Sequence, residues 1–477
     1  MTEWYELNDL DFRSRQWHFV GILGSGMRSM ATYALELGVR VTGSDLQSAD
    51  GLSELAARGA TVSLSQNGAA ITEQTDLVVA SQAIPRENRE LRKARRLGID
   101  VVRYPELLGV LMDYRKGVAV AGTHGKSTTS SIIAYVMARA GLDPSYLIGA
   151  EVPQLGGGAH CGEGEVLVAE ACEYKRSFLC LAPHVAVITN IDGDHLDYFH
   201  NMQDIEDAFV DFARGTRQDG LVVANADDPK TRRVLDRVGV RTTTYGIEAK
   251  EADYRAERIW RAKVHSNFDL VYKGRKVDRF SSELYGTHNV QNTLAAIAAC
   301  HELGMDFEQI QQGIRTFEGT ARRLQLVGSP WDVQVLSDYA HHPREIEASL
   351  AAAHQRFPKQ RVFVIFQPHQ YSRTRRMLEE MAEAFQSSWV TYVCDIYAAR
   401  DSQADRDAVS ARDLVRQMNH IGLLAHYVPE FQDIEDIIVG DVISDDVVLV
   451  MGAGDVWKVA ENIVPRIAEK GRRQIAA

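Results

Sequence analysis

The chain has few cysteines, and their spacing excludes several classes of protein. Among 477 residues there are only 5 cysteines, and no two of them form a C-x-x-C pair. Such pairs are typical of zinc ribbons and redox-active disulfides, and small secreted domains are much richer in cysteine. We therefore expect reduced thiols and a cytoplasmic protein.

The chain also lacks a basic excess and a long apolar run. Its formal net charge is -12 at pH 7. Broad binding to nucleic acid or to an anionic membrane needs an extended basic surface, and a membrane span needs roughly 20 apolar residues in succession. We expect no nucleic-acid partner and no membrane insertion. A phosphorylated substrate must then be held by a few local cations and a metal ion.

The length is too great for one hydrophobic core and predicts two to four domains. Predicted strands and helices alternate in three successive segments, which indicates α/β domains with parallel sheets. We place the domains at residues 1–113, 114–325 and 326–477. The expected fold is a Rossmann-like N-terminal domain, a central P-loop ATPase-like domain and a C-terminal Rossmann-like α/β domain.

A glycine-rich stretch at residues 122–129 follows a short apolar run and precedes a predicted helix over 130–140. A strand, a glycine turn and a helix N-terminus form a cradle for phosphate, with Lys126 as a point charge and Ser127 as a magnesium ligand. Two residues separate the glycines, where the usual P-loop has four. A simple turn with a surface lysine is the alternative, but the Lys-Ser-Thr-Thr run favours phosphate and metal.

The N-terminal segment carries a second glycine turn at residues 21–27, before a predicted helix over 29–37. Its spacing is G-x-x-G-x-G rather than the dinucleotide G-x-G-x-x-G, which disfavours NAD. Asp45 ends the next predicted strand, where an acidic residue reads a nucleotide sugar or base in such folds. Ser81 ends a later strand, where ligands bind these sheets, although a proline-capped loop explains it equally well.

Strand ends in the central segment deliver acidic and polar groups. Glu170 ends a buried strand, where magnesium-ligating carboxylates lie in nucleoside-triphosphate enzymes, and Glu173 is a possible second acid. His195 follows another strand end together with Asp192, which favours a metal or catalytic role over a structural one. We expect residues 240–284 to add antiparallel strands.

Polar groups also open a later helix and cluster in the third segment. His288, Asn289 and Asn292 are candidates for contact with a purine, since N-capping explains only one of them. Arg323 stands beside Arg322 at the predicted junction, where it would either reach a phosphate or be solvated.

Five motifs together resemble the Mur ligase family, in order and spacing, over nearly the whole chain. They are G-T-H-G-K-S-T at 122–128, N-I-D-G-D-H at 190–195, H-N-x-x-N at 288–292, D-Y-A-H-H-P at 338–343 and Q-P-H at 367–369. The resemblance implies three domains and an ATP-dependent, Mg2+-requiring ligase. It is strongest for the alanine-adding branch, which joins L-alanine to UDP-N-acetylmuramate through an acyl phosphate in peptidoglycan synthesis. A monomer or homodimer is expected.

The resemblance also implies a role for each motif residue. UDP-sugar binding falls to Gly24, Ser25, Gly26, Met27, Asp45 and Ser81. ATP binding falls to Gly122, Thr123, His124, Gly125, Lys126, Ser127, Thr128, His288, Asn289, Asn292, Arg323 and Asp338. Magnesium would be ligated by Ser127, Glu170 and His195, and L-alanine would be bound by Tyr339, His341, His369 and Arg373. The implied catalytic residues are Lys126, Glu170, His195 and Arg323.

Three departures from the family pattern bear on these roles. Ser127 replaces the usual threonine and keeps the hydroxyl. Many alanine-adding members read Glu-Ala-Asp-Glu-Ser where this chain reads E-A-C-E-Y-K at 170–175, so Cys172 and Lys175 change the local charge. Gln370 replaces an arginine, which leaves any anion contact there to another group such as Arg373.

Other functions remain open at this point. A murein-peptide ligase shares the ATP site and the UDP-sugar and differs only in joining a peptide. A folylpolyglutamate synthase is disfavoured because the N-terminal nucleotide domain suits a UDP-sugar. The glycine spacing argues against an NAD-dependent oxidoreductase. A non-catalytic nucleotide-binding module does not explain the set of Lys126, Glu170 and His195.

Overall fold

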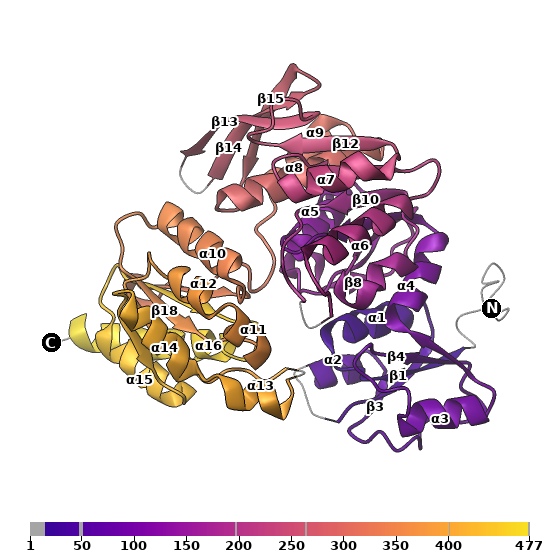
Figure 1. The fold of residues 1–477 in the computed structure, drawn as a ribbon, viewed down its shortest axis with the longest axis horizontal. Helices are drawn as coiled ribbons and strands as arrows, with labels where there is room; N and C mark the ends of the chain where they lie inside the picture. Colours follow the sequence, from indigo (N-terminus) through magenta and orange to yellow (C-terminus); the bar gives the residue numbers. More distant parts are fainter. Residues whose placement is uncertain (1–14, 47–50, 196–197, 263–264, 400, 476–477) are drawn as a thin grey trace. The chain divides into compact units, whose positions relative to one another are not determined.

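The computed structural model describes residues 15–46, 51–195, 198–262, 265–399 and 401–475. These residues divide into two compact units. Their helices and strands are labelled in Figure 1. Unit 1 takes its residues from 1–260, 267–282 and 291–318, and unit 2 takes them from 261–266, 283–290 and 319–477. Three separate sheets are present, and most of their strand pairs are parallel. The predicted α/β fold class with three domains is therefore confirmed.

The first sheet, in unit 1, has five strands in the order β3-β2-β1-β4-β5, and every pair is parallel. The chain leaves β1 on one side to β2 and returns on the other side as β4. The glycine turn after β1 therefore lies at the topological switch point, where such sheets bind ligands. The elements are β1 (Gln16–Val20), α1 (Ser25–Glu36), β2 (Arg40–Ser44), α2 (Gly51–Ala57), β3 (Thr61–Ser63), β4 (Leu77–Ala80), α3 (Arg89–Arg96), β5 (Asp100–Arg103) and α4 (Tyr104–Asp113).

The second sheet, formed almost entirely by unit 1, has ten strands in the order β15-β14-β13-β12-β11-β10-β6-β9-β7-β8. Strand β6 is central and parallel to both neighbours, β9 and β10, so the carboxyl ends of three buried strands meet at one edge. Its strands are β6 (Lys116–Ala121), β7 (Ser145–Leu147), β8 (Ala159–His160), β9 (Val166–Glu170), β10 (Val185–Ile188), β11 (Leu221–Asn225), β12 (Thr242–Gly246), β13 (Tyr254–Ala262), β14 (His265–Tyr272) and β15 (Arg275–Ser282).

Helices connect these strands and correct one prediction. Helix α7 is a crossover between β11 and β12, which makes β12 parallel to β11, and β13 continues parallel to β12 at Tyr245 and Gly246. The antiparallel prediction for residues 240–284 is therefore wrong for β12 and the start of β13. The connecting elements are α5 (Lys126–Arg139), η4 (Pro153–Leu155), η5 (Tyr174–Cys180), α6 (Met202–Arg214), α7 (Pro229–Val238), α8 (Thr287–Glu302) and α9 (Phe307–Arg315).

The third sheet lies in unit 2, in the order β16-β17-β21-β18-β19-β20, with only β16 antiparallel. Separate apolar clusters cover its two faces. The elements are β16 (Gln325–Gly328), η6 (Pro330–Asp332), β17 (Gln334–Asp338), α10 (Pro343–Arg356), β18 (Val362–Phe366), α11 (Tyr371–Arg376), α12 (Leu378–Glu383), β19 (Val390–Val393), α13 (Gln403–Ala408), α14 (Ala411–His420), β20 (Ala425–Tyr427), α15 (Phe431–Asp441), β21 (Val447–Met451) and α16 (Trp457–Ile475).

No helix in the described part of the chain combines the length and the apolar character that crossing a bilayer requires.

Candidate functional site

The glycine-rich loop after β6 has a backbone that only glycine adopts easily. Gly122 has φ +135° and Gly125 has φ +84°, both in the left-handed region. A Cβ on Gly122 would collide with the Thr189 hydroxyl, and one on Gly125 would collide with the side-chain amide of Asn292. The turn therefore leads directly into α5, whose first residue is Lys126. This arrangement presents a helix N-terminus and a cation together, as a phosphate cradle requires.

The end of the neighbouring strand β10 holds this loop in place. The Asn190 side chain accepts a hydrogen bond from the His124 N–H at 2.9 Å and donates one to the His124 carbonyl at 2.9 Å. The Thr189 hydroxyl also donates to that carbonyl, at 2.6 Å, and the Asp192 N–H donates to the Thr123 hydroxyl at 2.8 Å. This supporting role of Thr189 and Asn190 was not predicted from the sequence. The polar residues directly after a predicted strand were the feature that could have indicated it.

Lys126 is enclosed by oxygen acceptors. Its ammonium group donates to the carbonyls of Gly122 and Thr123 and to Glu173, whose carboxylate oxygens lie 3.0 and 3.2 Å away. Only 17% of the Lys126 side chain and 4% of the Glu173 side chain are exposed. Burial alone lowers the pKa of Lys126, but the neighbouring Glu173 carboxylate outweighs it, and the net pKa is raised. Lys126 therefore stays charged at neutral pH.

Glu173 connects Lys126 to His195. The His195 Nε2 lies 3.9 Å from a Glu173 carboxylate oxygen, and the His195 ring packs against Tyr174 with centroids 4.9 Å apart. His195 has φ +55°, an uncommon backbone conformation for a residue with a Cβ. The loop after β10 thus places this imidazole beside the carboxylate that contacts the phosphate-loop lysine.

A cavity of about 360 Å³ contains most of the predicted UDP-sugar residues. The glycine turn before α1, the Ser81 loop and the segment after β9 all contribute to its wall, and Glu170 lies in the wall with an oxygen that accepts the Gly149 N–H at 2.8 Å. The lining residues are Gly24, Ser25, Gly26, Met27, Ser81, Gln82, Tyr104, Pro105, Leu108, Gly149, Glu170, Cys172, Tyr174, Ser177, Phe178 and Leu181.

Asp45 is not among these lining residues. One of its carboxylate oxygens accepts the Leu23 N–H at 3.0 Å, and the other accepts the Leu46 N–H at 2.8 Å. Asp45 thereby supports the glycine turn that forms one wall of the cavity.

The predicted adenine residues have different surroundings. Asn292, in unit 1, approaches the phosphate loop, and its side-chain oxygen accepts from the Thr129 hydroxyl at 3.4 Å. Asn289 donates to the Tyr285 carbonyl at 2.7 Å, one turn earlier in the chain. His288 and Asn289 belong to the short segment 283–290 that is part of unit 2. Contact of these residues with a purine stays a prediction.

Unit 2 brings the four predicted alanine-binding residues into one cluster. The ring centroids of Tyr339 and His341 are 5.4 Å apart, those of His341 and His369 are 5.6 Å apart, and Arg373 lies 3.4 Å from the His369 Nδ1. Tyr397 stacks on His369 with ring centroids 5.6 Å apart, and this contact was not predicted from the sequence. The position of Tyr397 shortly after the end of β19 was the feature that could have indicated a place in the cluster.

Arg323 and Asp338 flank this cluster. The Arg323 guanidinium lies 5.2 Å from the centre of the Tyr339 ring, and Arg322 lies 4.8 Å from the same ring. The Asp338 carboxylate accepts the N–H groups of Leu324 and Ala340, both at 2.7 Å. Burial raises the pKa of Asp338, although Arg323 acts in the opposite direction. Asp338 thus holds the segment that carries Arg323.

A glycine-rich loop before a helix N-terminus, on a multidomain α/β scaffold with a cavity at a topological switch point, is typical of nucleotide-dependent enzymes. Three family models match in succession: the Mur ligase family catalytic domain at residues 16–116, the Mur ligase middle domain at 120–300 and the Mur ligase glutamate ligase domain at 322–454. The chain belongs to the Mur ligase family.

Individual members of this family are similar to the chain over nearly its whole length. The UDP-N-acetylmuramate–L-alanine ligase of Salinibacter ruber is 41% identical over 461 residues, which is 96% of each chain. The crystal structure of UDP-N-acetylmuramate-alanine ligase MurC from Thermotoga maritima superimposes with a TM-score of 0.82 at 26% identity, over 95% of this chain and 99% of that one. A murein peptide ligase from Psychrobacter arcticus superimposes with a TM-score of 0.71 at 23% identity, over 95% and 99%, and shows the fold alone.

Proposed function

We propose that this protein joins L-alanine to UDP-N-acetylmuramate with ATP, in the synthesis of peptidoglycan precursors. One observation carries the proposal: the last residue of β9 and the short segment directly after it supply both halves of the site. Its Glu170 lines the cavity that contains the UDP-sugar candidates, and its Glu173 contacts the phosphate-loop lysine. A sugar carboxylate and a nucleotide phosphate bound at these places would be brought close together, as ligation requires.

The chemistry follows from the poor reactivity of a carboxylate toward an amine. The sugar carboxylate attacks the γ-phosphorus of ATP, which forms an acyl phosphate and releases ADP. The deprotonated amine of L-alanine then attacks the acyl carbon, and phosphate leaves as the amide forms. We assign Lys126 to the β- and γ-phosphates, with the N–H groups of residues 122–128 around them. Arg323 and Asp338 are proposed for the same nucleotide, Arg323 as a further cation.

Magnesium fits the donor set near the phosphate loop. The Ser127 hydroxyl and the carboxylates of Glu170 and Glu173 are oxygen donors, the type that magnesium prefers. When bound, the ion would offset charge on the transferred phosphoryl group. His195, proposed with Ser127 and Glu170 as a metal ligand, also orients Glu173 through its 3.9 Å contact.

L-alanine is assigned to the cluster in unit 2. Arg373 is only 8% exposed and carries a planar guanidinium suited to a carboxylate. Tyr339, His341 and His369 would surround the small side chain and leave little space for a larger amino acid. This assignment explains how the site functions with Gln370 in place of an arginine.

The proposal also includes the localisation, the domain boundaries and the oligomeric state of the protein. The five free cysteines and the activity fit a cytoplasmic protein. We place the three domains at residues 1–113, 114–325 and 326–477. We expect the protein to be a monomer or a homodimer. A murein-peptide ligase is the alternative, but the relatives with about 40% identity over nearly the whole chain are named for L-alanine addition.

The test is phosphate release from ATP and magnesium with UDP-N-acetylmuramate, compared among L-alanine, glycine, L-serine and L-Ala-γ-D-Glu-diaminopimelate. Release should depend on the sugar nucleotide and be fastest with L-alanine. Turnover with the tripeptide alone would assign the protein to peptide ligation. Release that is independent of the sugar nucleotide would contradict the assignment of the cavity.

A further inference from the structure

The cavity in unit 1 is poorly equipped with charge for the ligand assigned to it. Among the lining residues that the structure describes, Glu170 is the only acidic side chain, and none is a lysine or an arginine. UDP-N-acetylmuramate carries a diphosphate and a carboxylate, so it is a strong anion. The protein as a whole also carries a formal charge of -12. The N–H groups at the start of α1 favour an anion, but a cationic side chain must come from beyond the wall.

Two cations flank the loop that forms one rim of this cavity. Arg103 donates from one side to the carbonyls of Ser81 and Ile84, at 2.7 and 2.8 Å. Lys175 donates from the other side to the carbonyl of Gln82 at 3.4 Å. Ser81 and Gln82 both line the cavity, so the two cations lie directly at its rim.

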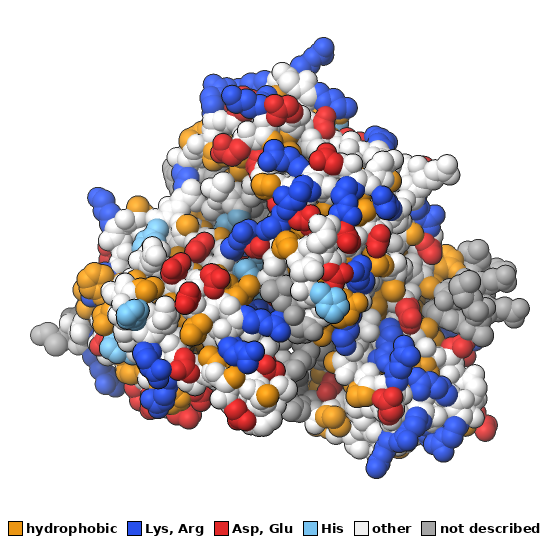
Figure 2. Space-filling view, viewed as in Figure 1, with side chains coloured by type: hydrophobic (Ala, Val, Ile, Leu, Met, Phe, Trp, Pro, Cys, Tyr) orange, Lys and Arg blue, Asp and Glu red, His pale blue; other side chains and the backbone are white. Residues whose placement is uncertain are grey.

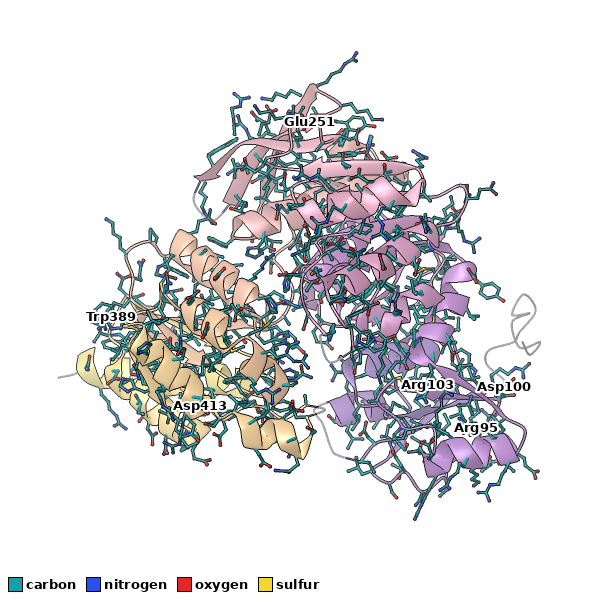
Figure 3. The ribbon with its side chains drawn as sticks, in the orientation of Figure 1. Arg95, Asp100, Arg103, Glu251, Trp389 and Asp413 are labelled. Carbon is teal, nitrogen blue, oxygen red and sulfur yellow. The ribbon has the colours of Figure 1, made fainter. Side chains whose placement is uncertain are left out.

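Arg103 binds the loop through its Nη1 atom, and further basic residues lie on α3. Figure 3 labels Arg103 at the end of β5 and Arg95 on α3, and Figure 2 shows that Lys and Arg side chains gather over α3. Arg95 donates to the Arg86 carbonyl at 2.9 Å, which keeps this group near the loop. These residues add positive potential to the rim, while Arg103 fixes its shape.

Lys175 is arranged differently and is able to change partners. Its side chain is exposed, it has no ion-pair partner in the part of the chain that the structure describes, and its single hydrogen bond is long. The ammonium group has three donors, so it can exchange a carbonyl for an anionic oxygen by small side-chain rotations. Tyr174 and Ser177, which precede and follow it in the chain, line the cavity.

The backbone at Lys175 is also unusual. Lys175 has φ +53° and the next residue, Arg176, has φ +56°. Two successive side chains in the left-handed region cost free energy that glycine would avoid, and such strain is typical of ligand sites. Arg176 is bound to Asp204, so of the two only Lys175 is available to a ligand.

We propose that the Lys175 ammonium group binds the anionic sugar nucleotide at the rim of the cavity, where it replaces the Gln82 carbonyl with a phosphate or carboxylate oxygen. This inference rests on the proposed function, because it takes its ligand from it. It also gives a role to Lys175, one of the residues by which the segment at 170–175 departs from the family pattern.

The test is calorimetric titration of the full-length protein with UDP-N-acetylmuramate in the absence of ATP. Lys175→Gln should weaken binding about tenfold, because a charge-assisted hydrogen bond to an anion is lost, and Lys175→Arg should restore most of the affinity. Lys116→Gln is the matched control, since it removes an exposed lysine at the start of β6 that is not among the residues lining the cavity, and it should bind as wild type does. The salt dependence of binding should be less steep in Lys175→Gln.

Lys175→Gly separates binding from folding. Glycine removes the charge and accepts the positive φ, so the melting temperature should stay equal or rise while affinity falls as in Lys175→Gln. Wild-type affinity in both variants would overturn the inference and leave the proposed function intact. Absence of binding by the wild type would contradict the proposed function and this inference together.

Discussion

Two lysine–glutamate pairs mark the two ends of strand β6 and have nearly the same length. At the start of the strand, Lys116 and Glu165 lie 2.9 Å apart, with 56% and 80% of their side chains exposed. Just after its end, Lys126 and Glu173 lie 3.0 Å apart, with 17% and 4% exposed. Distance therefore does not distinguish the pairs, and burial does.

The difference in burial determines how much each pair contributes to stability and to the proposed reaction. In the exposed pair, water and salt ions can replace the contact between the two side chains. Loss of this pair therefore changes the stability of the protein little. In the buried pair, removal of one partner leaves a charge in a site with low dielectric constant. Backbone carbonyls of Gly122 and Thr123 also surround Lys126 and fix its position. A charge held in this way contributes to catalysis because it needs no rearrangement during the reaction.

The largest expected contrast is between substitutions of the two lysines. Lys126→Met should reduce phosphate release with sugar nucleotide and L-alanine by at least about 100-fold, because the cation assigned to the transferred phosphate is lost. Lys116→Met should leave the rate unchanged. Equal losses in both variants would show that the position of Lys126 beside the glycine loop has no special importance.

The next contrast concerns stability. Glu173→Gln should lower the free energy of unfolding by about 3 kcal/mol, since it leaves the Lys126 charge buried without its carboxylate. Glu165→Gln should produce no measurable change in urea denaturation. The KM for ATP should also rise in Glu173→Gln as Lys126 loses one of its supports. A stable Glu173→Gln variant would mean that the two backbone carbonyls suffice to hold the lysine.

A buried carboxylate on α3, Glu90, allows a related comparison in which the pH is varied. Glu90 is 1% exposed, accepts from Ser44 and from the Gly68 N–H, and lies 3.5 Å from the His18 ring. Burial opposes ionisation, but the neighbouring His18 ring and the hydrogen bond from Ser44 outweigh it and hold the pKa of Glu90 below its ordinary 4.5. The ionised form thus stabilises the fold above that pH, and this contribution is lost as the pH falls through the lowered value.

Glu90→Gln should accordingly cost about 2 kcal/mol at pH 7, and the difference from wild type should shrink below pH 4.5. Urea denaturation at several pH values measures it. Glu165→Gln, examined in parallel, controls for the general effect of acid on the protein. A difference that is constant with pH would show that Glu90 acts through packing rather than charge.

The order of the elements could be predicted from the sequence because glycine turns and apolar runs mark parallel strands. The phosphate loop, the ends of β9 and β10 and the polar edge of the third sheet were all placed by this reasoning. The helix after the first glycine turn begins at Ser25 rather than at residue 29, because glycine and serine in its first turn concealed its start. Helix α5 likewise begins at Lys126, inside the motif itself.

Contacts between side chains were less predictable than strand ends. Asp45 was assigned to the ligand from its position at a strand end, and that assignment stays a prediction; its support of the glycine turn through the Leu23 N–H was not predicted. Tyr397 and Asn190 acquire their roles only through partners distant in the chain. Such pairings depend on the register of neighbouring strands, which a single sequence does not specify.

The hydrogen bonds between the phosphate loop and the end of β10 also have a consequence during synthesis of the protein. His124 and its partner Asn190 are 66 residues apart, and Thr123 and Asp192 are 69 apart. At a synthesis rate of about 5–20 residues per second, the loop leaves the ribosome several seconds before its supports. During that interval the loop lacks its hydrogen bonds to Asn190 and Asp192, so we expect the proposed phosphate site to form only after β10 has emerged and paired with β6.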